Sequence, residues 1–538
     1  MSQKNFWVRS SSRSSSSRSA AVIKPLALAA IVFLSGCASI KPEPLTSSEQ
    51  TQVNQADQSG MRKDVEPING PLTLETALAR ALKYNLDRRA KMMEEALALN
   101  QLDVSKFDML PSLVAKAGYA WRNNDHVNLS RDMITGQPSS ARFVSQERAH
   151  ETAELGLTWN ILDFGLGYYG ARQQSNRVLV ASEKRRKAMH LLIQDVRTAF
   201  WRAASAQKLR GDVKSTIDTA EQALEDSQKA EKERIRNPLD ALRYQRQLLE
   251  NLRLLEAINQ ELSSAQVELA SLINAPLGQT IEVVESSRDA ADDGILSIPV
   301  QQLEEAALMQ NADLREQHYN ARIARLETRK TMVRLFPNLS LSYAVKYDSD
   351  NYLLNRNWNE AGLQLSFNLF NLLTAPTQIK LADAGVLLAD QRRMATQMSV
   401  LTQVHLARLQ LLNARSQFAR ADTIYSVDQK IAELARNRAS AQAQSQLERV
   451  SNDTAGILSM LRRYQALAQV EKIEGQLLAQ LGLDPEIGST GELTLAQLAS
   501  QLKRSSDPWA AMRHPKPEVP DAAKTPEAAT PAPVKAAK

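Results

Sequence analysis

The sequence has few cysteines, few aromatic residues and no long apolar run in its main part, and each shortage excludes a class of protein. A single cysteine, Cys37, excludes an internal disulfide. Beyond the first forty residues no stretch reaches about 18 uncharged apolar residues, which excludes a transmembrane helix there and leaves only strands for a membrane passage. Aromatic residues make up 5%, and the bias towards Ala, Leu, Gln, Arg and Glu favours long helices.

The formal net charge of +6 does not indicate a nucleic-acid partner. Residues 1–36 contain five basic residues and no Asp or Glu, so nearly the whole excess lies in one terminal segment. A protein that binds nucleic acid needs a clustered basic face in its folded part. We therefore expect no nucleic-acid partner.

The segment around Cys37 predicts lipidation. A cationic, Ser-rich start is followed by a short apolar run, Leu26–Leu34, and then by Ser35-Gly36-Cys37. The run suits a signal peptide better than a membrane span. This order resembles the bacterial lipoprotein signal, which implies that residues 1–36 are removed and that Cys37 is acylated with chains such as palmitate. An ordinary signal peptide with a chance cysteine is the alternative. Residues 37–70 are polar and are interpreted as a tether.

No catalytic or metal-binding constellation is found. The six histidines form no pair at ligand spacing, and no second cysteine exists. Gly165, Gly167 and Gly170 match the spacing of a dinucleotide-binding loop, but the neighbouring strand alternates and the following helix is too long for a βαβ crossover. We interpret these glycines as turning the chain from strand to helix. The sequence predicts no enzyme, no cofactor and no metal.

The main part of the chain consists of two internal repeats. Asn85 and Asn311 end similar helical motifs, and Pro111 and Pro337 follow at the same offset. Both copies close on an apolar segment with a proline. The order of elements in each copy is helix, strand, strand, long helix, helix. We therefore divide the chain into a first repeat at 71–285, a second repeat at 286–485 and a tail at 486–538 that is disordered from about 514.

Four segments alternate apolar and polar residues. They are Ser112–Trp121, Thr152–Ile161, Asn338–Tyr347 and Glu360–Leu369. Each is about ten residues long, which crosses a bilayer as a tilted strand. A soluble sheet packed on helices is the alternative. The aromatic residues suited to a girdle at the membrane interface are Tyr119, Trp121, Trp159, Tyr343 and Tyr347.

The predicted helices are too long for an ordinary globular protein. Ala171–Asn237 contains no proline, and Met189, Val196 and other apolar residues recur at steps of three and four, which predicts coiled-coil packing. Pro238 suits the first turn of the returning helix. In the second repeat the turn is expected near Arg436–Leu447.

Four strands cannot close a barrel by themselves, and an open edge in lipid leaves backbone groups unpaired. Other copies of the chain must therefore complete the sheet. A larger number of strands leaves a lumen, whereas eight enclose mostly side chains.

These features resemble the TolC-like outer membrane factors over about residues 71–485. The resemblance rests on the duplicated Asn85 and Asn311 motifs, on the two prolines and on the Trp159–Gly165 segment between strand and helix. It implies a mixed α/β membrane protein, a homotrimer whose twelve strands form a β-barrel on a periplasmic α-helical tunnel. It also implies a periplasmic adaptor and an inner-membrane transporter as partners. The glycine-bearing tip motif usual in the family is absent at Arg236–Leu242 and blurred in the second repeat.

The expected function is that of a passive exit duct of a tripartite efflux system, lipid-anchored in the outer membrane. Protein secretion through a type I system is a second possibility, and a periplasmic coiled-coil scaffold that forms no channel is a third. Candidate positions at the helix turns, facing the adaptor, are Arg236, Asn237, Asp240, Arg436 and Asn437. Asp240 and Arg243 are the candidates for a gate.

Overall fold

The computed structural model describes residues 42–233, 237–285, 294–440, 446–485, 487, 490 and 492–505. It divides into two units, residues 1–64 and 65–538, each of which is described by itself. The predicted signal peptide, Cys37 and the tail beyond residue 505 lie outside the described residues.

The described part of the first unit contains one helix, α2 (Ser47–Arg62). Thr46 caps it: its hydroxyl oxygen accepts a hydrogen bond from the backbone N–H of Glu49, and its own N–H donates to the Glu49 carboxylate at 2.9 Å. This reciprocal pair satisfies two backbone donors at the helix start. The segment predicted as a tether therefore contains a helix, whereas its role as a tether stays a prediction.

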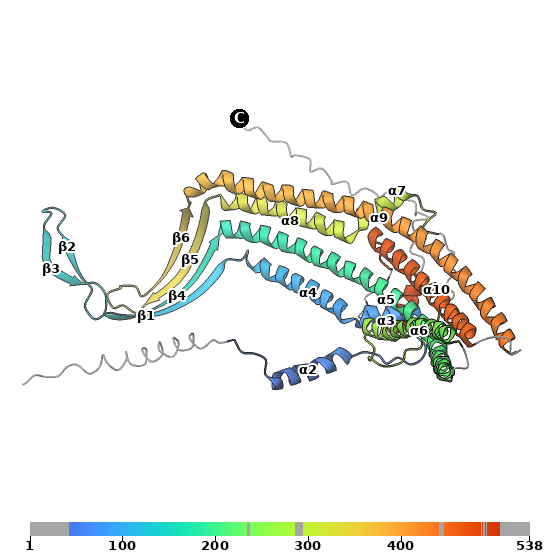
Figure 1. Ribbon diagram of the computed structural model, residues 1–538. Helices are drawn as coiled ribbons and strands as arrows, with labels where there is room; N and C mark the ends of the chain where they lie inside the picture. The colour runs from blue at the N-terminus through green and yellow to red at the C-terminus, as the bar shows by residue number, and fades with distance from the viewer. Residues whose placement is uncertain are drawn as a thin grey trace, which may run out of the picture. The chain divides into compact units, whose positions relative to one another are not determined.

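The second unit repeats one order of elements, as the sequence predicts (Figure 1). The first copy consists of α3 (Leu74–Tyr84), α4 (Leu86–Phe107), β1 (Ser112–Trp121), β4 (Ala149–Asn160), α5 (Ile161–Lys232) and α6 (Pro238–Leu272). The second consists of α7 (Val300–Gln310), α8 (Ala312–Arg334), β5 (Asn338–Asp348), β6 (Asn357–Ser366), α9 (Phe370–Ser440) and α10 (Gln446–Leu481). A hairpin of β2 (Val127–Arg131) and β3 (Pro138–Val144) is inserted in the first copy only, and α11 (Leu495–Arg504) follows the second.

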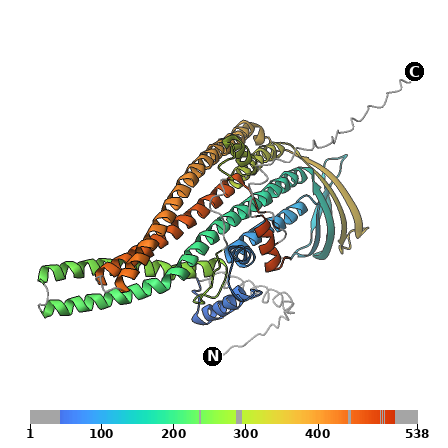
Figure 2. The same cartoon turned by 90° about the vertical axis from the view of Figure 1, so that its right-hand side faces the viewer.

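The helix α5 is the centre of the helical part. It packs against α4, α6, α8 and α10, while α9 packs against α8 and α10 (Figures 1 and 2). Its 72 residues extend on the order of 100 Å. Met189, Val196, Phe200 and Val213 are buried along one stripe of α5. In α6, apolar residues at similar steps from Leu248 to Leu269 are buried as well. The heptad-like pattern is thus confirmed as coiled-coil packing.

The apolar core is divided along the helices. One cluster joins α3 and α11 to α5 around Tyr84, Phe200 and Leu498. A second lies between α7, α8, α9 and α10, around Leu303 and Val404. Two smaller clusters continue between α5, α6 and α10. The long helices are therefore held by separate contacts along their length and by no single globular core.

The four long strands form one antiparallel sheet in the order β1-β4-β5-β6. It extends from the end of the helical part at which α4, α5, α8 and α9 meet it (Figures 1 and 2). Among the described elements only α5 makes substantial contact with the sheet, at β4 and β5, and side chains on both faces are mostly exposed. The strand expected at Glu360–Leu369 is displaced: β6 ends at Ser366, since α9 begins at Phe370.

Candidate functional site

The sheet has one apolar and one polar face across all four strands. The register places Leu113 beside Leu157, Leu157 beside Tyr343 and Tyr343 beside Ala361. One residue along, Ser112, Thr158, Ser342 and Gly362 form the matching row on the opposite face. Because side chains alternate along each strand, the rows continue these two characters over most of the sheet. Val114 interrupts the polar face, and Glu151 and Asn359 interrupt the apolar face. The predicted alternation therefore combines into two largely continuous surfaces.

The five aromatic residues predicted for a girdle all lie on the apolar face, but at different levels. Tyr119, Trp121 and Tyr347 lie at the ends of β1 and β5 far from the long helices. Trp159 lies at the other end, next to α5, where its ring meets Phe164 edge-on at 6.0 Å. Tyr343 lies in the middle of β5. Four of the five thus mark the two ends of the sheet, and Tyr343 does not.

The connection between β4 and α5 corrects the interpretation of Gly165, Gly167 and Gly170. All three lie inside α5, which begins directly after the strand at Ile161. A Cβ atom at Gly167 would lie 3.0 Å from the carbonyl oxygen of Asp108, and one at Gly165 would lie 3.2 Å from Val333. These two glycines therefore allow close approach of other segments to α5 and do not turn the chain. The turn itself is held by Asn160, whose side-chain nitrogen donates to Asp163 at 2.8 Å.

The second repeat makes the same transition without a glycine. The segment from Asn371 to Pro376 lies within α9. Pro376 is the seventh residue of that helix, where it removes one backbone N–H donor. Proline is thus placed near the start of the helix, before its long packed part.

Asn85 and Asn311 perform the same structural task in the two repeats. Each ends one helix and caps the next, with backbone angles that agree within 2° (φ −60, ψ 128 and φ −58, ψ 129). Each Oδ1 accepts from the N–H three residues ahead at 3.0 Å. Each Nδ2 donates to a carbonyl near the end of a returning helix, Leu272 at 3.1 Å and Gln480 at 2.9 Å. The duplicated motif therefore fastens the first two helices of each repeat to the end of its last long helix.

A charge network joins the end of the second repeat to α5; its α5 members are largely buried, whereas Asp484 is partly exposed. Arg186 donates to Asp484 at 2.6 Å and to the Gly482 carbonyl oxygen at 2.6 Å, and it also pairs with Glu183. The Nε2 atom of His190 lies 2.7 Å from Asp484. Burial opposes ionisation of Asp484, but the His190 hydrogen bond and the Arg186 charge outweigh it and hold the pKa of Asp484 below its ordinary value. Local sequence patterns do not predict this network, because Arg186 and Asp484 are 298 positions apart in the chain.

The described tip of the first helix pair is exposed and carries polar side chains together with two exposed leucines, Leu239 and Leu242. Asn237 caps α6 by accepting from the N–H of Leu239 at 3.0 Å, and Pro238 occupies the first turn, as predicted. Asp240 and Arg243 are exposed and lie 3.9 Å apart on adjacent turns. Arg236 lies outside the described residues. In the second pair, Arg436 and Asn437 lie in the last turns of α9, and residues 441–445 lie outside the described residues.

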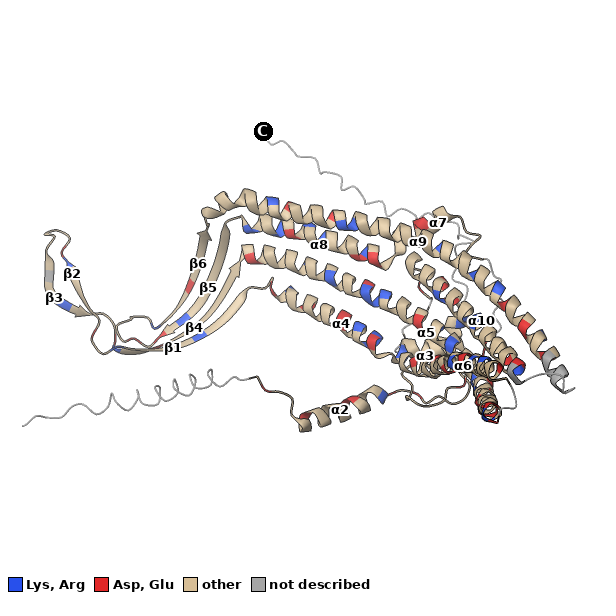
Figure 3. Cartoon of the chain, in the orientation of Figure 1, with Lys and Arg blue, Asp and Glu red and all other residues tan. Residues whose placement is uncertain are grey.

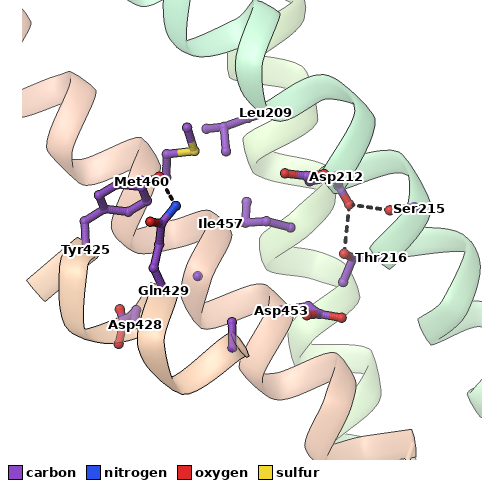
Figure 4. Close-up of a pocket in the computed structure, with 12 residues that line it drawn as sticks. Leu209, Asp212, Ser215, Thr216, Tyr425, Asp428, Gln429, Asp453, Ile457 and Met460 are labelled. Atoms are coloured by element: carbon purple, nitrogen blue, oxygen red, sulfur yellow. Dashed lines mark hydrogen bonds between the residues drawn. The ribbon is translucent and has the colours of Figure 1, made fainter. Parts of the chain in front are cut away.

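An acidic pocket of about 260 Å³ lies between α5, α9 and α10 (Figure 4). Asp212, Asp428 and Asp453 contribute carboxylates from three different helices. The hydroxyls of Ser215 and Thr216 donate back to the carbonyl oxygen of Asp212, at 3.1 and 2.8 Å, and are thus already engaged. Within the described residues no group of three His, Cys, Asp or Glu side chains could hold a metal ion.

Charged residues of both signs lie along the helices, and the sheet carries few (Figure 3). No described helix combines the length and the apolar character needed to cross a membrane. The features to compare with known proteins are the sheet, the long helix pairs and their duplicated arrangement.

No protein-family profile and no curated protein sequence matches the chain. Solved structures do. The CmeC outer membrane channel of Campylobacter jejuni matches with a TM-score of 0.59 at 13% identity, covering 81% of this chain and 89% of CmeC. CusC, a protein that forms a transmembrane channel, matches with 0.56 at 16% identity, covering 76% and 92%. The outer-membrane channel OprN matches with 0.56 at 14% identity, covering 76% and 89%.

This chain has the fold of the outer-membrane channels. The matches cover most of this chain and nearly all of each channel protein. The resemblance to TolC-like outer membrane factors inferred from the repeated motifs is thus confirmed at the level of the fold. The sheet, with its apolar and polar faces, and the long helix pairs are the candidate functional parts of this fold.

Proposed function

We propose that the chain is the outer-membrane duct of a tripartite efflux system and conducts small molecules passively. The observation that carries this proposal is the sheet, which has one apolar face, one polar face and no helix packed over either among the described elements. An apolar face of this kind requires lipid or another protein, and a polar face requires water. A bilayer on one side and a water-filled lumen on the other satisfy both.

The edges of the sheet support assembly. β1 and β6 each have a partner on one side only within the described sheet. In a bilayer those free backbone groups cost several kcal/mol each unless a neighbouring strand pairs with them. β1 of one protomer pairing with β6 of the next closes the sheet, and three protomers supply twelve strands. The number three comes from the resemblance to TolC-like factors.

The anchor is proposed from the signal-like segment before Cys37, and the partners are proposed from the resemblance to TolC-like factors. Acylation of Cys37 tethers the chain to the outer membrane, and the long helices extend into the periplasm. The exposed tip of the first helix pair, with Asn237, Asp240 and Arg243, faces a periplasmic adaptor, and Asp240 and Arg243 contribute to the closed state. Arg236, Arg436 and Asn437 belong to the same end of the helices.

Two other functions are distinguished by experiment. A secretion duct would use the same channel, with cargo selected by its partners. A scaffold lipoprotein that forms no channel would need its sheet covered, and no described element covers it. This absence of a cover favours the duct.

The deciding experiment is reconstitution of the purified full-length chain in planar lipid bilayers. We expect discrete conductance steps and an oligomer that dissociates only on heating. A protein that remains monomeric, gives no conductance and leaves the membrane when the acylated segment is cleaved would contradict the proposal. Replacing Cys37→Ala is the control for the anchor, because it removes acylation and leaves the sheet intact.

A further inference from the structure

One row on the polar face of the sheet differs from all the others. The register aligns Lys116 of β1 with Glu154 of β4, Glu154 with Lys346 of β5, and Lys346 with Trp358 of β6. Every strand therefore places a long side chain at this one level. The side chains belong to the face on which Ser112, Thr158 and Ser342 also lie.

The charges in this row are paired across strands. Lys116 Nζ lies 3.1 Å from Glu154, and Lys346 Nζ lies 2.7 Å from Glu360, which follows Trp358 on the same face of β6. Lys116 and Glu360 are more than half exposed, whereas Glu154 and Lys346 in the two central strands are about 30% exposed. Two lysines and two glutamates thus alternate across the sheet with no excess of either sign.

The neighbouring rows contain small residues. Gly118 and Thr152 lie on one side, in line with Asp348, and Gly156 and Ala344 lie on the other, in line with Val114 and Glu360. A Cβ atom at Gly118 would lie 2.9 Å from the Thr152 hydroxyl, so even alanine would crowd this surface. Within the four strands, the remaining charged residue on the polar face is Asp348, the last residue of β5. The row, together with Glu360 in the adjacent row, therefore carries four of the five Lys, Arg, Asp and Glu residues on the polar face of the four strands.

We propose that Lys116, Glu154, Lys346 and Glu360 form the charge filter of the barrel and admit solutes of either sign. This inference rests on the proposed function, in which the polar face lines the lumen. Because strands in such barrels tilt by roughly 45°, each protomer contributes an inclined row, and the rows spread over part of the barrel height. Alternating charges a few ångströms apart cancel beyond about one Debye length, roughly 8 Å at physiological salt. Removing one sign exposes the other to every passing solute.

The test measures passage from the outer side, so that it does not depend on the state of the periplasmic tips. A reporter cysteine is introduced by Gln364→Cys, on the polar face of β6 between the row and α9. Cells that carry the full-length chain are treated with small cationic or anionic methanethiosulfonate reagents. The chain without the reporter measures the background. We expect the two labelling rates, corrected for the reaction of each reagent with free thiols, to agree within about threefold.

The charge variants should shift this ratio in opposite directions. Glu154→Gln with Glu360→Gln should favour the anionic reagent by about fivefold or more, and Lys116→Gln with Lys346→Gln should favour the cationic reagent by a similar factor. The exchange Lys116→Glu with Glu154→Lys keeps the balance and should leave the ratio unchanged. Glu151→Gln removes a carboxylate from the opposite face of β4 and should also have no effect.

Different results would refute the charge filter alone or the filter together with the duct. A second reporter, Ala120→Cys, lies on the polar face at the far end of β1 and shows that the protein is assembled and accessible. If the cysteine at 120 is labelled and the ratio at 364 is the same in every charge variant, the filter is refuted and the duct stands. If the cysteine at 364 stays unreactive to both reagents while that at 120 reacts, the polar face does not line an open lumen, and both proposals fail.

Discussion

The Nε2 atom of His190 lies 2.7 Å from Oδ1 of Asp484 and so joins the first long helix to the end of the second repeat. The pKa of Asp484 is lowered in the folded protein, so this carboxylate contributes stability above its unfolded pKa near 4 and loses it as the pH falls through the folded value. We expect Asp484→Asn to lower the free energy of unfolding at neutral pH by about 1–2 kcal/mol, since the site is partly exposed.

The same variant should also weaken the pH dependence. Thermal unfolding in detergent, followed between pH 6 and pH 2.5, should show a smaller loss of stability for Asp484→Asn than for the unchanged protein. Asp240→Asn is the matched control, because Asp240 is exposed and, among the described residues, pairs with Arg243 one turn away. Equal pH profiles for the Asp484 variant and the unchanged protein would show that the network does not contribute to acid sensitivity.

Two glycines in the helical part should respond to alanine in opposite ways. Gly482 has φ +66, and a Cβ atom there would overlap the carbonyl oxygen of Gln310, so Gly482→Ala should destabilise the protein by about 3 kcal/mol or more. Gly211 lies inside α5 with nothing within 4 Å of its Cβ position. Gly211→Ala should stabilise the protein by about 0.5–1 kcal/mol. Chemical denaturation of both variants measures the two changes in stability. Destabilisation by Gly211→Ala would contradict the prediction.

Two substitutions at each site can separate the two roles of Asn85 and Asn311, the cap of the next helix and the hydrogen bond to the returning helix. Asn85→Asp keeps the oxygen that caps α4 and removes the N–H donor to Leu272, whereas Asn85→Ala removes both. We expect the alanine variant to cost about 1–2 kcal/mol and the aspartate variant about half of that. Asn311→Asp and Asn311→Ala should show the same order, because the second site has the same contacts. Thermal melts of all four variants measure this, and a reversed order at either site would refute the assigned roles.

Adjacent residues of β6 test which face meets lipid. Leu363 lies on the apolar face and Gln364 on the polar face. Leu363→Arg should disfavour membrane insertion by about 2–4 kcal/mol, and Gln364→Arg should insert normally. The fraction of heat-modifiable oligomer recovered from outer membranes measures the difference. Equal recovery of the two variants would contradict the assignment of faces.

The periodic elements could be predicted from the sequence. The strand Ser112–Trp121, the return at Pro238 and the duplicated Asn85 and Asn311 breaks all lie where their patterns place them. These signals are local, since alternation, capping and a proline at a helix start act within a few residues. The capping box of Thr46 and Glu49 is a signal of the same kind, and the helix that it begins was not predicted.

The remaining features depend on contacts between distant parts of the chain. Glycine is a poor helix former, so the local sequence at Gly165 and Gly167 indicates a turn. Their place inside α5 is explained by the segments at Asp108 and Val333, which approach there. The charge row from Lys116 to Trp358 likewise needs the register of four strands, which alternation alone does not give. Alternation does not predict the β2–β3 hairpin, because β2 alternates over only five residues and β3 does not alternate regularly.

That hairpin has a consequence for symmetry. The helices of the two repeats are close copies, so a ring of three chains would approach sixfold symmetry through its helical part. The far rim of the sheet cannot, since the connection between β1 and β4 carries the hairpin and the one between β5 and β6, residues 349–356, is short. The proposed trimer would thus present three tall and three low loops in alternation. An antibody fragment against the turn at Asp132–Gln137 would then bind with a stoichiometry of at most three per channel.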